Sequence, residues 1–205
     1  SFTVTQPAAF TSSIIGANSG GGFNISCADG SNGATSGSIT GGNAPFSYAW
    51  SGPGAFTANT ANISGRPAGV YNLVVTDAFG CSFNTSVTLT QPPALSASTT
   101  VVANVLCNGA STGSATASAN GGVAPYSYSW NTVPVQSGPL ANNLAAGTWV
   151  CTVTDANGCS TNANVIISQP ATALSANVGG TTPVSCFGGN NGTATVSASG
   201  GTPNY

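Results

Sequence analysis

The 205-residue chain contains one arginine, three aspartates and no histidine, so only 2% of it is charged, against about a quarter of an ordinary soluble domain. Without histidine neither a Ser/His/Asp triad nor a Cys/His dyad can form, and one cation cannot neutralise a nucleic-acid backbone. We therefore predict no enzyme activity, no cofactor, no metal site and no nucleic-acid partner; because no apolar run reaches about 18 residues, we also expect no membrane insertion.

An internal repeat is the strongest feature of the sequence. The stretch CADGSNGATSGSITGGNAPFSYAW at 27–50 recurs as CNGASTGSATASANGGVAPYSYSW at 107–130. Further on, AGVYNLVVTDAFGCSFNTSVTLTQP at 68–92 recurs as AGTWVCTVTDANGCSTNANVIISQP at 146–170, and a third copy opens at Cys186. Agreement over so many spaced Gly, Cys, Trp, Asp and Gln-Pro positions predicts tandem repeats of about 80 residues.

The limits of the repeats follow from where the pattern starts and stops. SFTVTQP at 1–7 matches SVTLTQP at 86–92, which closes a repeat. The predicted divisions are the last strand of a preceding repeat at 1–7, complete repeats at 8–92 and 93–170, and the first part of a following repeat at 171–205.

Each repeat consists of short segments with alternating apolar and polar residues, separated by Gly, Asn and Pro turns, which predicts β-strands. Small residues alternate over 115–119, aromatic residues over 46–50, and larger apolar residues over 71–75 and 87–89. No segment has a helical period, so we predict an all-β fold of sandwich repeats. The largest predicted core side chains are Trp50, Trp130, Tyr71 and Trp149.

A turn with an aspartate recurs between the last two strands of each repeat, as TDAFGC at 76–81 and TDANGC at 154–159. Asp77 and Asp155 are predicted to accept backbone N–H groups at the start of the turn, while Gly80 and Gly158 supply a positive φ. A calcium site is the alternative, but a hard cation prefers about six oxygens with several carboxylates. One aspartate per turn favours the structural role.

Six cysteines without the spacing of metal ligands predict disulfides and an oxidising compartment. One cysteine opens each repeat and another ends the aspartate turn, so we predict the pairs Cys27–Cys81 and Cys107–Cys159. If the first cysteine of a repeat does not reach the far end of the sandwich, Cys107–Cys151 is the competing pair and Cys159 is free. Otherwise Cys151 is a small buried apolar residue.

The combination C-x-G, TGSAT, GG-x-APYSYSW, VTDANGCS and QP resembles the SprB repeat, which occurs in very large secreted surface proteins of gliding Bacteroidetes. The aromatic strand and the G-x-Y-x-V-x-V-x-D strand are also similar to PKD-type and immunoglobulin-like domains. The resemblance implies tandem immunoglobulin/PKD-like β-sandwich repeats in an extracellular, cell-surface adhesin or filament with a link to gliding motility. The second repeat departs from the first at Trp149 and Cys151, where the first has Tyr71 and Leu73.

Three functions remain open at this point. The leading hypothesis is a stalk segment of a secreted surface adhesin, whose partners are neighbouring repeats of the same chain. A self-assembling extracellular fibre is the second, in which 1–7 and 186–205 of different copies complement one another by donor-strand addition. The third is a carbohydrate-binding module for surface glycans, with Phe56, Phe79 and Phe83 as candidate contact residues.

Overall fold

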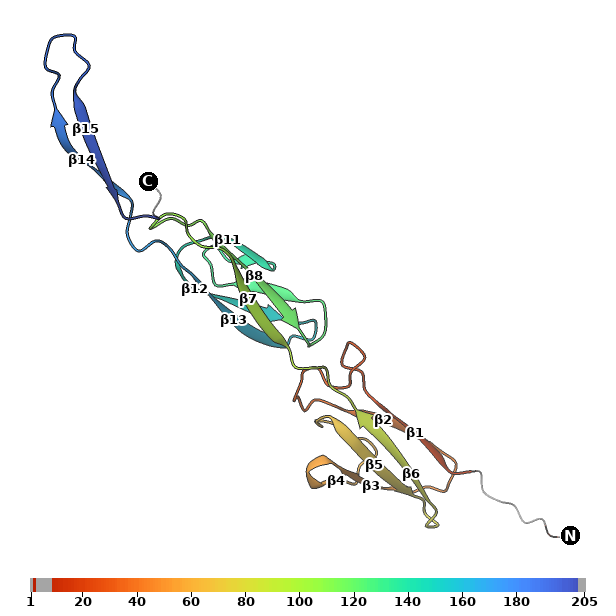
Figure 1. The fold of residues 1–205 in the computed structure, drawn as a ribbon. Coiled ribbons are helices and arrows are strands. Elements are labelled where there is room, and N and C mark those ends of the chain that lie inside the picture. Colours follow the sequence, from red (N-terminus) through yellow and green to blue (C-terminus); the bar gives the residue numbers. More distant parts are fainter. Residues whose placement is uncertain (1, 3–8, 203–205) are drawn as a thin grey trace. The chain divides into compact units, whose positions relative to one another are not determined.

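The computed structural model describes residue 2 and residues 9–202 of the chain (Figure 1). Apart from Phe2, the predicted final strand at 1–7 lies outside the described residues. The chain divides into two compact units. The first comprises Ser1–Ser96, Asn120–Tyr126 and Thr154–Thr161, and the second comprises Ala97–Ala119, Ser127–Val153 and Asn162–Tyr205.

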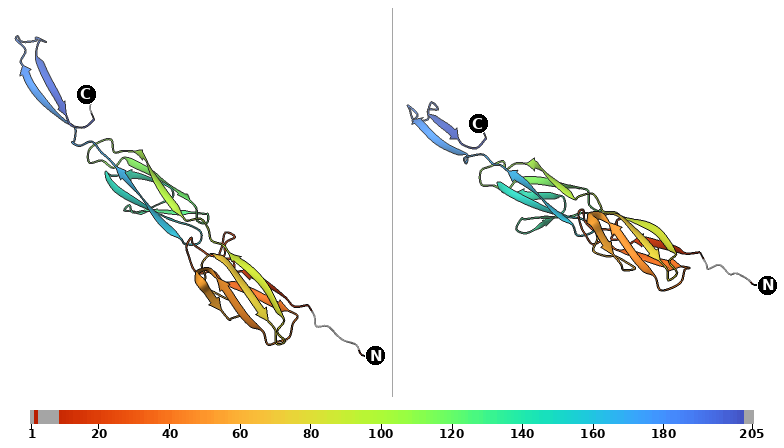
Figure 2. Two further views of the ribbon diagram at one scale, coloured as in Figure 1. Left: turned by 60° about the horizontal axis from the view of Figure 1, so that its bottom comes forward. Right: turned by 90° about the horizontal axis from the view of Figure 1, so that it is seen from below.

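Two antiparallel sheets form most of the first unit. Their strands are β1 (Thr11–Gly16), β2 (Thr35–Thr40), β3 (Ser47–Gly52), β4 (Phe56–Ala58), β5 (Gly69–Thr76) and β6 (Ser82–Leu89), with one 3-10 turn, η1 (Pro53–Ala55). β1 pairs with β2, and the other sheet has the order β4-β3-β5-β6. Figure 2 shows the strands of this unit from two further sides. β5 and β6 pair over their whole length, from Gly69 opposite Leu89 to Thr76 opposite Ser82.

The core of the first unit lies between these two sheets. Alternation places Tyr71, Leu73 and Val75 on the buried face of β5. Ile14 of β1 and Ile39 of β2 pack against the same cluster, so the two sheets form a sandwich. Burying each such side chain contributes about 1.5–3 kcal/mol relative to leaving it exposed.

The second unit contains the greater part of a second sandwich. Its strands are β7 (Ser96–Ala103), β8 (Gly113–Asn120), β9 (Ser127–Trp130), β10 (Gln136–Ser137), β11 (Leu140–Leu144), β12 (Gly147–Thr154) and β13 (Ser160–Ile167). They form one sheet of order β11-β8-β7 and another of order β10-β9-β12-β13. Ala115 and Ala117 of β8 are buried, as are Trp130 of β9 and Val153 of β12. The predicted all-β fold of immunoglobulin-like sandwich repeats is confirmed.

A hairpin of β14 (Ser175–Thr182) and β15 (Thr193–Ser199) completes the second unit. The two strands pair antiparallel, with Val178 opposite Val196. Both valines are largely exposed, because no other strand within residues 9–202 pairs with the hairpin.

Candidate functional site: a disulfide between successive repeats

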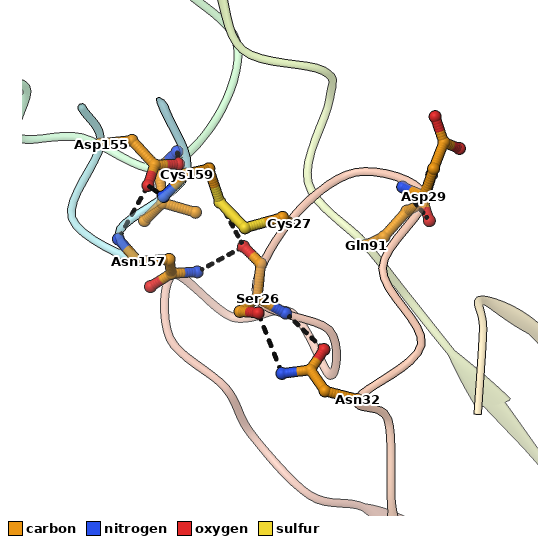
Figure 3. The surroundings of a disulfide bond; sticks show 9 residues. Ser26, Cys27, Asp29, Asn32, Gln91, Asp155, Asn157 and Cys159 are labelled. Atoms are coloured by element: carbon orange, nitrogen blue, oxygen red, sulfur yellow. Dashed lines mark hydrogen bonds between the residues drawn. A yellow bond between two sulfur atoms is a disulfide. The ribbon is translucent and has the colours of Figure 1, made fainter. Parts of the chain in front are cut away.

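A disulfide joins Cys27 of the first repeat to Cys159 of the second (Figure 3). The two residues are 132 positions apart in the sequence, their Cα atoms are 5.8 Å apart, and both belong to the first unit. The predicted pairs Cys27–Cys81 and Cys107–Cys159 are therefore wrong. Cys81 and Cys107 are free and exposed.

The direction of β6 explains why Cys27 does not pair with Cys81. The loop that holds Cys27 lies at the far end of β6, where the backbone N–H of Ile25 donates to the Thr90 oxygen at 3.0 Å. Cys81 immediately precedes the other end of this eight-residue strand. At about 3.4 Å per residue the strand spans about 27 Å, whereas a disulfide tolerates a Cα separation of only about 7 Å.

The aspartate turn holds Cys159 in place. One carboxylate oxygen of Asp155 accepts the backbone N–H groups of Asn157 and Cys159, each at 2.9 Å. The other accepts the N–H of Val123 at 2.9 Å. Gly158 has a φ of 83°, which an L side chain rarely adopts. Cys159 is thus fixed at the residue before β13.

The turn in the first repeat is built in the same way. Asp77 accepts the N–H groups of Phe79 and Cys81 at 2.9 Å and that of Asn43 at 3.1 Å, and Gly80 has a φ of 84°. Burial alone would raise the pKa of Asp77, but the hydrogen bonds from Cys81, Asn43 and Phe79 outweigh it and hold the pKa below its ordinary value. Each predicted turn residue therefore lies in the turn.

The loop around Cys27 carries the other sulfur atom of the disulfide. Its backbone is held by Asn32, whose oxygen accepts the Ser26 N–H at 3.2 Å, and by Gln91, whose oxygen accepts the Asp29 N–H at 3.1 Å. Asn157 donates its side-chain N–H to the Ser26 carbonyl at 2.9 Å, so the two loops meet through a hydrogen bond as well as the disulfide (Figure 3). The Cys159 sulfur also lies 3.4 Å from this carbonyl, a polar contact because an oxidised sulfur has no hydrogen to donate.

Sequence reasoning did not identify Gln91, Asn32 or Asn157 as part of this site. The recurrence of Gln-Pro at the end of each repeat was the one available signal for Gln91. It indicated a repeat boundary, while the side chain's hydrogen bond to a loop 62 residues earlier depends on the tertiary fold.

The predicted core residues occupy different depths. Trp50, Trp130 and Tyr71 are buried, and Trp149 is half-buried. The Tyr71 hydroxyl donates to the Pro67 carbonyl at 3.0 Å, and the Trp149 indole N–H donates to the Ala145 carbonyl at 3.0 Å. Each bond reaches back four residues, so the tryptophan replaces the tyrosine without loss of the bond, which resembles the tyrosine corner of immunoglobulin-like domains.

Cys151 is buried on β12 and free, and Cys107 is free and exposed, so the competing pair Cys107–Cys151 is not formed. Burial raises the pKa of the Cys151 thiol, and a hydrogen bond with the Ser129 backbone lowers it only in part. A thiol that is both buried and protonated is a poor nucleophile.

The three candidate aromatic residues do not form an exposed row. Phe56 packs edge-on against Tyr71 at 5.8 Å, with the Arg66 guanidinium 4.3 Å above its ring. Phe83 is partly buried beside Phe10, and only Phe79 is largely exposed, at 78%. A sugar-binding platform needs neighbouring exposed rings, so this arrangement does not favour one.

Neither a cluster of metal ligands nor a membrane-spanning helix occurs among the described residues. No three His, Cys, Asp or Glu side chains among them lie close enough together to hold a metal ion. No helix in the same part of the chain is long and apolar enough to cross a membrane.

The family model of the SprB repeat matches residues 24–55, 99–135 and 179–205. These three segments are SprB repeats. Each SprB segment includes the first cysteine of its repeat, namely Cys27, Cys107 and Cys186. No curated protein matches the chain.

Several solved structures resemble this chain at low similarity. The eight N-terminal Ig domains of Down Syndrome Cell Adhesion Molecule (DSCAM) are 15% identical over 79% of this chain, with a TM-score of 0.33; the match spans only 27% of that chain. A tetra-tandem repeat from the extending region of a large adhesion protein is 14% identical over 94% of this chain and 66% of its own, with a TM-score of 0.28. Murine CEACAM1b is 13% identical over 77% of this chain and 99% of its own, with a TM-score of 0.31.

Proposed function

We propose that this chain is a stalk segment of a large secreted cell-surface adhesin, in which SprB repeats supply length and resistance to tension. The observation that supports the proposal most directly is the bond between Cys27 and Cys159, which joins two successive repeats over 132 positions. A stalk under tension must not lengthen as its repeats unfold one after another. A covalent bond between repeats transmits the force itself, so the chain between the two cysteines is not stretched.

The chemistry of the surface and of the cysteines is consistent with this role. Disulfides persist in oxidising compartments, which supports an extracellular location. With 2% charged residues, neighbouring repeats repel each other little. We divide the stalk into repeats at 8–92 and 93–170, with a further repeat opening at 171–205, and assign no catalytic role to any residue.

Surface display and reach provide the test. An antibody raised against the 205-residue chain should stain intact, unpermeabilised cells, and protease treatment of those cells should remove the staining. An in-frame deletion of residues 8–170 should bring adherent particles closer to the cell without abolishing their binding. Staining that appears only after permeabilisation would overturn the proposal.

The carbohydrate-binding alternative makes an opposite prediction. As a stalk segment, the 205-residue chain should bind no glycan on an array above the level of a denatured control. Glycan binding that is lost on Phe79→Ala but retained in Phe56→Ala would favour a lectin function, because Phe79 is the exposed ring.

A further inference from the structure

Two exposed cysteines, Cys81 and Cys107, are free although their counterparts in the repeat are bonded to each other. Cys81 ends the aspartate turn as Cys159 does, and Cys107 opens its repeat as Cys27 does. We propose that each is half of the same bond between successive repeats. Cys107 pairs with the turn cysteine of the following SprB repeat, and Cys81 pairs with the first cysteine of the preceding one.

The loop around Cys107 already has the conformation of the bonded loop. The Ala110 N–H donates to the Cys107 carbonyl at 3.0 Å, as the Gly30 N–H does to that of Cys27 at 3.1 Å. The Gly109 N–H donates to the Gln169 side chain at 2.9 Å, the counterpart of the bond between Asp29 and Gln91.

The position two residues after the first cysteine has a positive φ in both loops, 57° at Asp29 and 81° at Gly109. The third repeat shows the same backbone, with a φ of 77° at Gly188 and a bond from the Gly189 N–H to the Cys186 carbonyl at 2.9 Å. The loop is therefore shaped by its own repeat and does not depend on a bonded partner.

The turn that holds Cys81 is likewise preformed. The Cys81 N–H donates to the Asp77 carboxylate at 2.9 Å, and the Cys159 N–H donates to Asp155 at the same distance. Phe79, at the position of Asn157, is largely exposed beside Cys81. Phe79 and Cys81 are therefore exposed at the same two positions of the turn through which Asn157 and Cys159 contact the Cys27 loop.

A cavity of about 440 Å³ lies beside Cys107, lined in part by Leu106, Leu174 and Gly201. Leu174 and Gly201 are the repeat counterparts of Leu95 and Gly122. A Cβ atom built on Gly122 would lie 2.6 Å from an Asp155 carboxylate oxygen and 3.2 Å from Leu95, so this corner of the first unit is filled by the aspartate turn.

A Cβ on Gly201 would similarly lie 3.2 Å from Leu174. Leu174 and Gly201 therefore repeat the surface on which the aspartate turn packs in the first unit. This surface lies next to Cys107, which is the first cysteine of its repeat, as Cys27 is. We accordingly assign this cavity to one occupant, the aspartate turn of the following SprB repeat in the same array.

Bond formation requires an oxidant, which we take to be a low-molecular-weight or protein disulfide. The Cys107 thiolate attacks one sulfur of that disulfide and displaces a thiolate, which leaves a mixed disulfide. The thiolate of the turn cysteine then attacks the Cys107 sulfur and displaces the second thiolate. Two thiols are oxidised, one disulfide is reduced to two thiols, and the two protons are taken up by the departing thiolates.

The test extends the full chain so that a third turn is present. Residues 127–170 are appended after Tyr205, the counterpart of Tyr126, so that the third repeat gains its own copy of the turn cysteine. The protein is folded in oxidised and reduced glutathione and treated with a maleimide, and its disulfides are mapped by mass spectrometry without reduction. The matched control replaces the appended turn cysteine by serine.

We expect Cys107 to lose its maleimide adduct and to appear in a peptide linked to the appended turn cysteine. In the control Cys107 should be labelled again, and Cys81 should be labelled in both proteins. The Cys27–Cys159 peptide reports that the repeats have folded. A labelled Cys107 in the extended protein, a bond from the appended cysteine to Cys186, or the absence of the Cys27–Cys159 peptide would each overturn the proposal.

The inference rests on the proposed function in one respect, since a stalk implies further repeats on either side. The two can nevertheless fail separately. Antibody staining of intact cells does not depend on which cysteines pair, and bond mapping does not depend on where the protein is displayed.

Discussion

Because of the bond between Cys27 and Cys159, the residues between these two cysteines should not be extended by a force applied at the chain termini. The two ends of the bond are 132 positions apart but only 5.8 Å apart in space. An extended chain spans about 3.3–3.6 Å per residue, so reduction should release about 450 Å of additional length. In the chain-entropy model, closing a loop of this size also stabilises the fold by about 5 kcal/mol.

Single-molecule stretching with handles at the two termini measures this length. We expect the fully unfolded oxidised protein to be about 450 Å shorter than the reduced protein. Cys27→Ser should give the long form even under oxidising conditions. Cys81→Ser is the matched control, because it removes a cysteine that is free in this chain and should change nothing.

Bonds within each repeat would behave differently. The pairs Cys27–Cys81 and Cys107–Cys159 would hide two separate loops of about 180 Å each. Cys27→Ser would then release only one of them. A half-release in this variant, or equal lengths in the oxidised and reduced proteins, would show that Cys27 and Cys159 are not bonded to each other.

Three further predictions concern single side chains. Because the folded-state pKa of Asp77 lies below its ordinary value of 3.8, its contribution to stability is complete above that pH and is lost as the pH falls through the folded pKa. The melting temperature should therefore fall between about pH 5 and pH 2, and Asp77→Asn should flatten that fall; an identical fall in the variant would contradict the assignment. Tyr71→Phe should lower the free energy of unfolding in urea by about 1 kcal/mol, since it removes the hydrogen bond to Pro67; no change would show that the bond is not stabilising. Native protein at pH 7 should take up maleimide at Cys81 but not at Cys151, which is buried and has a raised pKa; mass spectrometry that finds equal labelling would disprove the burial.

Local features of this protein were readable from its residues. The alternation in 71–75 places the same three side chains in the core that the structure buries. The aspartate turn was equally predictable, because the carboxylate of Asp77 and the glycine at position 80 act within four residues of each other. Such contacts depend on spacing along the chain, and spacing is what a repeat displays.

The partner of Cys27 could not be obtained in that way. A tandem repeat contains each cysteine position several times, so a bond within a repeat and a bond between repeats satisfy the same sequence pattern equally well. The choice depends on which end of the sandwich holds each loop, and β6 separates Cys27 from Cys81 by about 27 Å. The repeat, its strands and its turns could be predicted from the residues alone, because these features follow from neighbouring positions in the chain. That the disulfide joins one repeat to the next depends on the folded arrangement, because strand direction sets the distance between sulfur atoms that are far apart in the chain.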